Sequence, residues 1–112
     1  MPNLKKKLEA KELTVGTWVT IPNQAIIEIL STAGFEWITL DIEHSAVSIE
    51  SVQNLLGHIQ GNGMQGLVRV SKNEEVVIKR VMDAGAEGVI VPMIKSKTDA
   101  EQAVSFVKYP PV

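Results

Sequence analysis

An acid and a base follow directly after an apolar, strand-like run. The run Trp37-Ile38-Thr39-Leu40 leads into Asp41, and Glu43 and His44 come next. Because ligands of parallel α/β proteins bind at the carboxyl ends of strands, Asp41 and His44 could lie close enough there to share a proton. A carboxylate that orients an imidazole gives a general base near neutral pH. Equally open is that Asp41 and Ser48 cap the next helix and that His44 is a polar loop residue.

Three further residues fall near predicted strand ends or adjacent turns. Arg69 lies between Val68 and Val70, and an arginine in an apolar strand is costly unless it meets an anion or several acceptors. Its fork suits a carboxylate or a developing enolate oxygen, and a purely structural pairing with a neighbouring acid is an equal alternative. Asp83 closes a predicted helix and reads locally as a helix-end polar residue. Trp18 could wall a pocket, although a half-buried core tryptophan is the commoner case.

Composition favours a globular protein and excludes several functional classes. The 112 residues, 45% hydrophobic and 21% charged, suit one small domain or part of a larger one. The net charge of -2 gives no sign of a nucleic-acid or membrane partner. The absence of cysteine excludes disulfides, zinc–thiolate sites and thiol catalysis. No apolar run is long enough for a membrane span or a secretory signal, so we expect a cytoplasmic protein.

Hydrophobic periodicity predicts a short helix followed by four β-α units. The lead-in helix is expected at residues 3–12. Strands are predicted at residues 13–20, 36–41, 66–70 and 88–93, the last of them fully buried. The following helices are predicted to begin at the caps Asn23, Ser48, Asn73 and Thr98, with Glu101 completing a capping box at the last. This order, without a hairpin signal, requires a parallel sheet with right-handed crossovers.

A weak internal repeat accompanies the β-α pattern. Ala33-Gly34-Phe35-Glu36-Trp37-Ile38 is similar to Ala84-Gly85-Ala86-Glu87-Gly88-Val89, two units further along the chain. Repeated βα units suit a (β/α)8 barrel, which needs eight units and about twice this length. Residues 1–112 are therefore predicted to be either the first four βα units of a TIM barrel or a four-stranded open sheet.

Seven short blocks, in this order and spacing, resemble the HpcH/HpaI aldolases, which are class II pyruvate aldolases of the phosphoenolpyruvate/pyruvate TIM-barrel superfamily. The blocks are Val15-Gly16-Thr17-Trp18, Ala33-Gly34-Phe35-Glu36-Trp37, Asp41-Ile42-Glu43-His44, Val68-Arg69-Val70, Met82-Asp83-Ala84-Gly85, Val91-Pro92-Met93 and Tyr109-Pro110-Pro111. The resemblance implies a single N-terminal half-barrel over residues 1–112. It also implies a lyase that reversibly cleaves 4-hydroxy-2-oxo acids to pyruvate, or a similar 2-oxo acid, and an aldehyde.

The resemblance also implies roles for individual residues. His44 falls on the catalytic base, and Asp41 and Asp83 fall on acids that interact with it. Arg69 falls on the arginine that contacts the pyruvate oxygen and stabilises the enolate, and Trp18 falls on the wall of the substrate pocket. The residue between Asp41 and His44 in this block, Glu43, has a supporting role at most.

The resemblance further implies a divalent metal, Mg²⁺, Mn²⁺ or Co²⁺, in the full family fold. Its expected ligands, a Glu after the fifth strand and an Asp after the sixth, lie beyond Val112, so this chain alone is expected to bind no metal and to lack a complete site. The expected partners are a 2-oxo acid and either further copies of the chain or a complementing second half-barrel. Two alternatives stay open: a non-catalytic half-barrel that acts as a structural or interaction module, and a related lyase for citramalyl- or malyl-type substrates.

Overall fold

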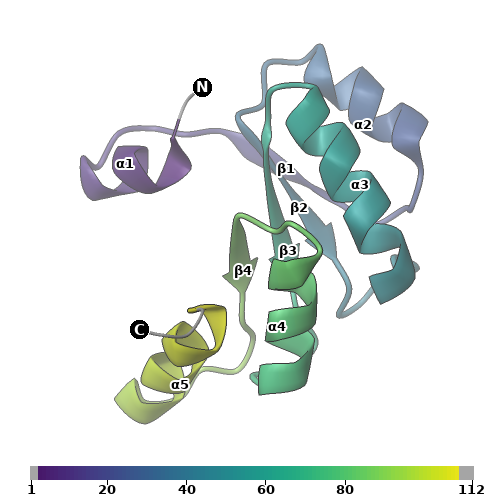
Figure 1. Cartoon of the computed structure of the whole chain (residues 1–112). Coiled ribbons are helices and arrows are strands. Elements are labelled where there is room, and N and C mark those ends of the chain that lie inside the picture. Colours follow the sequence, from purple (N-terminus) through teal and green to yellow (C-terminus); the bar gives the residue numbers. More distant parts are fainter. Residues whose placement is uncertain (1–2, 109–112) are drawn as a thin grey trace.

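Four parallel strands form one sheet, in the order β1-β2-β3-β4, in the computed structural model, which describes residues 3–108. The strands are β1 (Gly16–Val19), β2 (Trp37–Asp41), β3 (Gln65–Arg69) and β4 (Gly88–Ile90). The helices are α1 (Leu4–Glu9), α2 (Gln24–Ser31), α3 (Ile49–Gly61), α4 (Glu75–Asp83) and α5 (Lys97–Val107). A helix follows every strand, which confirms the four predicted βα units. Figure 1 shows α2, α3 and α4 along one side of the sheet, with α1 and α5 projecting on the side of β4.

The core lies between the sheet and the helices α2, α3 and α4. Alternate residues of a strand point to opposite faces, so Ile38, Leu40 and Val68 all point toward the helices and are fully buried. Gly66 lets α3 pack directly on β3, because a Cβ at this position would lie 2.5 Å from the Leu56 side chain. We call the face of the sheet that packs against α2, α3 and α4 the helix face, and the opposite face the inner face.

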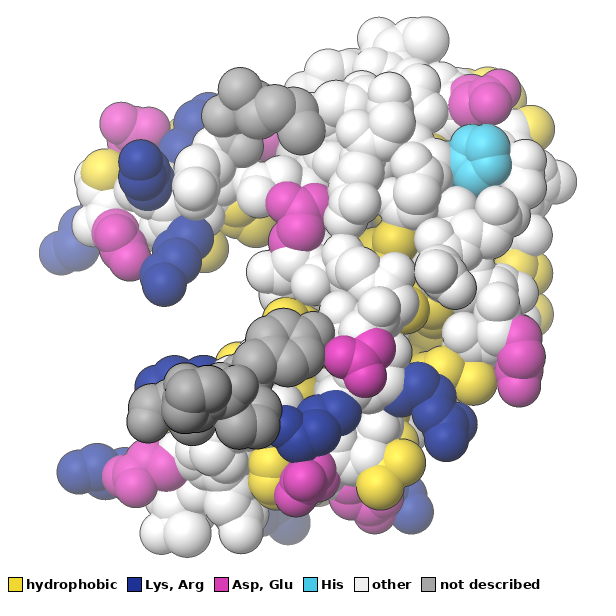
Figure 2. Space-filling view, viewed as in Figure 1, with side chains coloured by type: hydrophobic (Ala, Val, Ile, Leu, Met, Phe, Trp, Pro, Cys, Tyr) yellow, Lys and Arg dark blue, Asp and Glu magenta, His cyan; other side chains and the backbone are white. Residues whose placement is uncertain are grey.

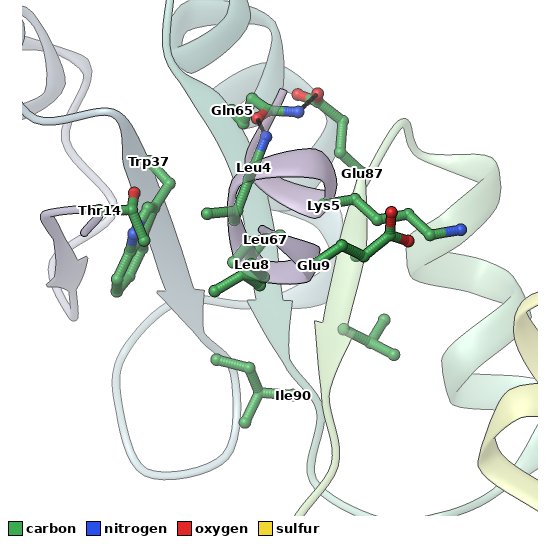
Figure 3. Close-up of a pocket in the computed structure, with 12 residues that line it drawn as sticks. Leu4, Lys5, Leu8, Glu9, Thr14, Trp37, Gln65, Leu67, Glu87 and Ile90 are labelled. Carbon is green, nitrogen blue, oxygen red and sulfur yellow. Dashed lines mark hydrogen bonds between the residues drawn. The ribbon is translucent and has the colours of Figure 1, made fainter. Parts of the chain in front are cut away.

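The inner face is partly covered by α1. Figure 3 shows Leu4 and Leu8 of α1 over Leu67 of the inner face, where they line an apolar cavity of about 700 Å³. Lys7 holds the helix in place through an ion pair with Glu36, whose Oε2 lies 2.6 Å from the lysine Nζ. The short helix therefore closes the amino-terminal side of the sheet and leaves the carboxyl-terminal side open.

The fourth strand differs from the prediction of a fully buried strand over residues 88–93. It has three residues, Gly88–Ile90, all of them half-buried. Within the described chain β4 pairs with β3 alone and is an edge strand. Two residues take the chain out of the sheet: Pro92 has no N–H to donate, and Met93 has a φ of 60°.

Two of the four predicted helix caps are wrong. Asn23 caps α2 as predicted, and Ser48 holds the N-cap position of α3 without a capping hydrogen bond from its side chain. The cap of α4 is Glu74 rather than Asn73, because the Asn73 amide donates to the carbonyl of Asp99. The cap of α5 is Ser96 rather than Thr98, and its hydroxyl accepts from the N–H of Asp99.

Apolar side chains stay exposed along both edges of the sheet. Leu13, Val15 and Ile21 flank the β1 edge, and Met93 and Ile94 follow β4. Figure 2 shows a hollow on this open side, between the parts of the molecule formed by α1 and α5. None of the helices in residues 3–108 has the length and hydrophobicity to cross a bilayer. The Tyr109-Pro110-Pro111 block lies outside the described residues.

Candidate active site

Asp41 and Arg69 form an ion pair at the carboxyl edge of the inner face. They are register partners on β2 and β3, so both side chains leave the sheet at the same height. Arg69 Nη2 lies 2.6 Å from Asp41 Oδ2, and Arg69 Nε lies 3.1 Å from Oδ1. This bidentate geometry fixes the plane of the guanidinium. Arg69 therefore pairs with a neighbouring acid, as the structural alternative in the sequence analysis describes.

The Asp41 carboxylate also organises the turn that follows β2. Its Oδ1 accepts the backbone N–H of Glu43 at 2.9 Å and that of His44 at 3.2 Å. The hydrogen bonds from Arg69, followed by those from the two backbone amides, lower the pKa of Asp41 to about 2 against the opposing effect of burial. Asp41 is only 3% exposed and is ionised at neutral pH. The side chain that anchors Arg69 therefore also places His44.

Two other side chains complete the surroundings of Arg69. The Trp18 ring centroid lies 4.8 Å from the guanidinium carbon, at the distance of a cation–π contact. Glu43 Oε1 lies 3.3 Å from Arg69 Nε. The hydrogen bonds to Asp41, followed by the negative charges of Asp41 and Glu43, raise the pKa of the Arg69 guanidinium. Trp18, predicted as a pocket wall, therefore lies beside Arg69.

The imidazole of His44 faces Glu43 rather than Asp41. Its Nε2 lies 3.4 Å from Glu43 Oε2, and the side chain is 70% exposed. Asp41 reaches His44 only through the backbone N–H, so the expectation that its carboxylate orients the ring needs correction. The physical reason is competition, because Arg69 and two amides already occupy the Asp41 oxygens. The only signal for Glu43 in the sequence is its position beside the histidine.

Asp83 does not join this group within one chain. It is the last residue of α4, and the turn at Gly85 leads from it to the start of β4. A crossover helix runs antiparallel to its strands, so α4 ends at the amino edge of the sheet, close to the start of β4 (Figure 1). Asp83, its last residue, therefore lies at the edge opposite to the one where β2 and β3 end in Asp41 and Arg69. The interaction with His44 that the resemblance implied is therefore not formed in this chain. The other histidine, His58, lies in the last turn of α3.

The acids of this edge do not fit a metal site. A divalent ion needs several free oxygen or nitrogen ligands, but Asp41 and Glu43 already face the guanidinium of Arg69. Within residues 3–108 no cluster of three His, Asp or Glu side chains has the arrangement of a metal site. The chain does bring together a cation, a histidine and an aromatic side chain at this edge of the sheet.

Sequence comparison places these residues in a family of lyases. Residues 14–112 match the family HpcH/HpaI aldolase/citrate lyase. A 5-keto-4-deoxy-D-glucarate aldolase of Escherichia coli O139:H28 (strain E24377A / ETEC) is 39% identical over 111 residues, which make up 98% of this chain and 43% of that protein. The chain thus spans less than half the length of the curated relatives that it matches.

Solved structures agree with this assignment. The HpcH/HpaI aldolase from Desulfitobacterium hafniense DCB-2 superimposes with a TM-score of 0.87 at 33% identity, over 96% of this chain and 42% of that one. Citrate synthase SbnG gives a TM-score of 0.87 at 30% identity, over 96% of this chain and 44% of that one. The four βα units thus align with part of a TIM-barrel aldolase, as the half-barrel prediction requires. The chain belongs to the HpcH/HpaI aldolase/citrate lyase family.

Proposed function

We propose that this chain carries the base and the enolate-binding residues of an aldolase that cleaves 4-hydroxy-2-oxo acids to pyruvate, or a similar 2-oxo acid, and an aldehyde. The observation that carries the proposal is the fixed guanidinium of Arg69, held by Asp41 beside Trp18 and His44. Asp41 accepts from Nε and from one N–H of Nη2, so the N–H groups of Nη1 and the second one of Nη2 are left for a substrate oxygen. A planar donor of this kind stabilises the charge that develops on an enolate.

In this proposal His44 moves the proton. In the cleavage direction the imidazole accepts the proton of the 4-hydroxyl group, the bond between C3 and C4 breaks, and its electron pair forms the enolate. The aldehyde leaves, and the imidazolium of His44 gives its proton to C3 of the enolate, which forms the methyl group of the 2-oxo acid and returns the neutral base. Arg69 faces the enolate oxygen throughout. The divalent metal that the family resemblance implies would take its ligands outside the described residues, so no step is assigned to it here.

A chimeric protein tests this function. We would join this chain after Val112 to the part of the E. coli aldolase that lies beyond its match with the chain. The proposal predicts that the chimera cleaves 5-keto-4-deoxy-D-glucarate, the substrate in the name of that relative, when a divalent metal is present. Arg69→Lys keeps the charge but loses the fork, and we expect it to lower kcat/KM by about 100-fold. Normal cleavage by Arg69→Lys would contradict the assignment.

A second candidate function is a non-catalytic half-barrel that binds another polypeptide. The apolar side chains exposed along both sheet edges favour this candidate, because edges of this kind invite association. The occupant under either function would be a complementing second half-barrel or a further copy of the chain. A chimera that folds and binds a divalent metal yet never cleaves or enolises a 2-oxo acid would favour this second candidate. A chimera that cleaves only citramalyl- or malyl-type substrates would instead support the related lyase.

A further inference from the structure

We propose that two copies of this chain associate into one ring of eight parallel strands, in which β1 of each copy packs into the groove between β4 and α5 of the other. The inference rests on the second candidate function, the binding of another polypeptide, and names that polypeptide as a second copy. It does not require the chain to catalyse a reaction, so the oligomeric state alone can test it.

An apolar groove of about 440 Å³ lies beside β4 on the helix face of the sheet, and we call it the α5 groove. Val89 and Val91 line it from the strand, and Ala103 and Val104 line it from the helix. Residues 97–107, which the structure describes in full, include no buried side chain, so α5 has an apolar face without a complete cover. Within the described chain β4 pairs with β3 alone. The groove therefore offers an apolar surface and an unpaired backbone edge to one more parallel strand.

The edge at β1 carries exposed apolar side chains on the same face of the sheet. Val15 lies four residues before the buried Val19, so the alternation of a strand puts both on the helix face. Val15 is 49% exposed, and Leu13, two residues earlier, is 84% exposed. The groove residue Val89 is on this face too, because it is the register partner of the buried Val68. An apolar ridge, Leu13 and Val15, and an apolar groove thus lie on one face at opposite edges of the sheet.

A two-fold axis brings each ridge to the groove of the other copy. β1 and β4 are parallel and stand at the two ends of the strand order β1-β2-β3-β4. Rotation about an axis along the strands therefore sets β1 of each copy parallel to β4 of the other, and the two contacts are identical and close the ring. The four βα units superimpose on part of a TIM-barrel aldolase, so the sheet has the curvature that a ring of eight parallel strands requires.

Charges at the amino edge of the sheet favour the same contact. Glu12 directly precedes Leu13 of the ridge, and Lys108 directly follows α5, and both residues are exposed. Figure 1 shows that α5 runs back toward the amino edge, so Lys108 lies at the end of the groove that would receive the start of β1. The contact therefore brings an acid of one copy to the end of the groove where the other copy carries a base.

Light scattering behind a size-exclusion column measures the oligomeric state over a range of chain concentrations. We expect a mass of twice the 12.2 kDa of one chain, without larger species. A monomer at every concentration would overturn the proposal and leave a complementing half-barrel as the occupant of the edges. A series of growing oligomers would overturn it too, because contacts that do not close form open polymers.

Lysine substitutions test both sides of the contact. Leu13→Lys on the ridge and Val104→Lys in the groove should each raise the dissociation constant of the dimer by about 100-fold, since the two-fold axis places each change in the interface twice. Ile29→Lys on α2 is the matched control, because Ile29 is 68% exposed and lies on neither edge, and its dimer should be unchanged. Circular dichroism checks that each variant is folded. A dimer that Leu13→Lys and Val104→Lys leave intact would overturn the proposal.

Thiol crosslinking shows which edges meet, since the chain has no cysteine of its own. A mixture of Leu13→Cys and Val104→Cys chains should give a covalent pair with a short bismaleimide, whereas each variant alone should give none. Crosslinking of Leu13→Cys with itself would mean that two β1 edges meet and would contradict the proposal. These measurements are independent of activity: an inactive chimera would leave the dimer standing, and a monomeric chain would leave the aldolase proposal standing.

Discussion

Arg69 Nη2 lies 2.6 Å from Asp41 Oδ2, and the two residues are register partners on neighbouring strands. The strand pairing therefore brings the ion pair into contact without help from a loop. Because sites built on strands are held more firmly than sites on loops, the guanidinium is oriented before any substrate arrives.

Removing the Asp41 charge should change how stability depends on pH. The pKa of Asp41 falls from its ordinary 3.8 to about 2 in the folded chain, so the ionised carboxylate stabilises the fold above about pH 4. This contribution, roughly 2 kcal/mol, is lost as the pH falls toward 2. Asp41→Asn should therefore have a lower free energy of unfolding than wild type at pH 7 and a nearly equal one at pH 2. Urea titrations of both proteins at several pH values measure this, and a pH-independent difference would count against the ion pair.

Glycine at position 16 should be required by the packing of Trp37. A Cβ on Gly16 would lie 1.9 Å from the Trp37 ring, so the indole would have to move to make room for it. Gly16→Ala should therefore lower the free energy of unfolding by about 1–3 kcal/mol. Gly57→Ala is the matched control, since α3 leaves open space around Gly57 and alanine favours a helix by roughly 0.5–1 kcal/mol. The midpoint of chemical denaturation should therefore fall in Gly16→Ala and rise in Gly57→Ala. Equal shifts in the two variants would refute this packing.

The indole of Trp18 should matter more for substrate binding than for the fold. It covers the Arg69 guanidinium at 4.8 Å but is 40% exposed, so the contact is worth about 0.5–1 kcal/mol. In the chimera, Trp18→Leu should raise KM for the 2-oxo acid severalfold while the midpoint of urea unfolding moves little. Trp37→Leu, at the other tryptophan, should show the converse pattern of a lower unfolding midpoint. A Trp18→Leu enzyme with unchanged KM would remove this residue from the substrate pocket.

The order of elements could be predicted from the sequence because it depends on local periodicity. The apolar run Trp37-Ile38-Thr39-Leu40 marks β2, and the spacing of apolar residues marks α3. Two caps differ from the prediction because Asn73 and Thr98 have the right residue type, while the N-cap positions belong to Glu74, which makes no side-chain capping bond, and to Ser96, which does. Choices of this kind depend on tertiary contacts that a local pattern does not contain.

The sequence predicts which residues belong to the site but not how they pair. Asp41, Arg69 and Trp18 were expected at the strand ends, and the parallel register brings them together. Their pairing could not be predicted, because the nearest base in sequence to Asp41 is His44, whereas its nearest cation in space comes from the adjacent strand. The expected contact of Asp83 with His44 comes from the family resemblance alone. The predicted βα order already returns the end of α4, and with it Asp83, to the amino edge of the sheet.

The central claim is that His44 and Arg69 form an enolisation site, and exchange of the pyruvate methyl protons with deuterated water tests it most directly. The exchange would be followed by NMR in the chimera with Mg²⁺, Mn²⁺ or Co²⁺, and His58→Ala would control for the loss of a histidine. We predict metal-dependent exchange that falls by at least 100-fold in His44→Ala and stays unchanged in His58→Ala. Exchange at the normal rate in His44→Ala would contradict the account.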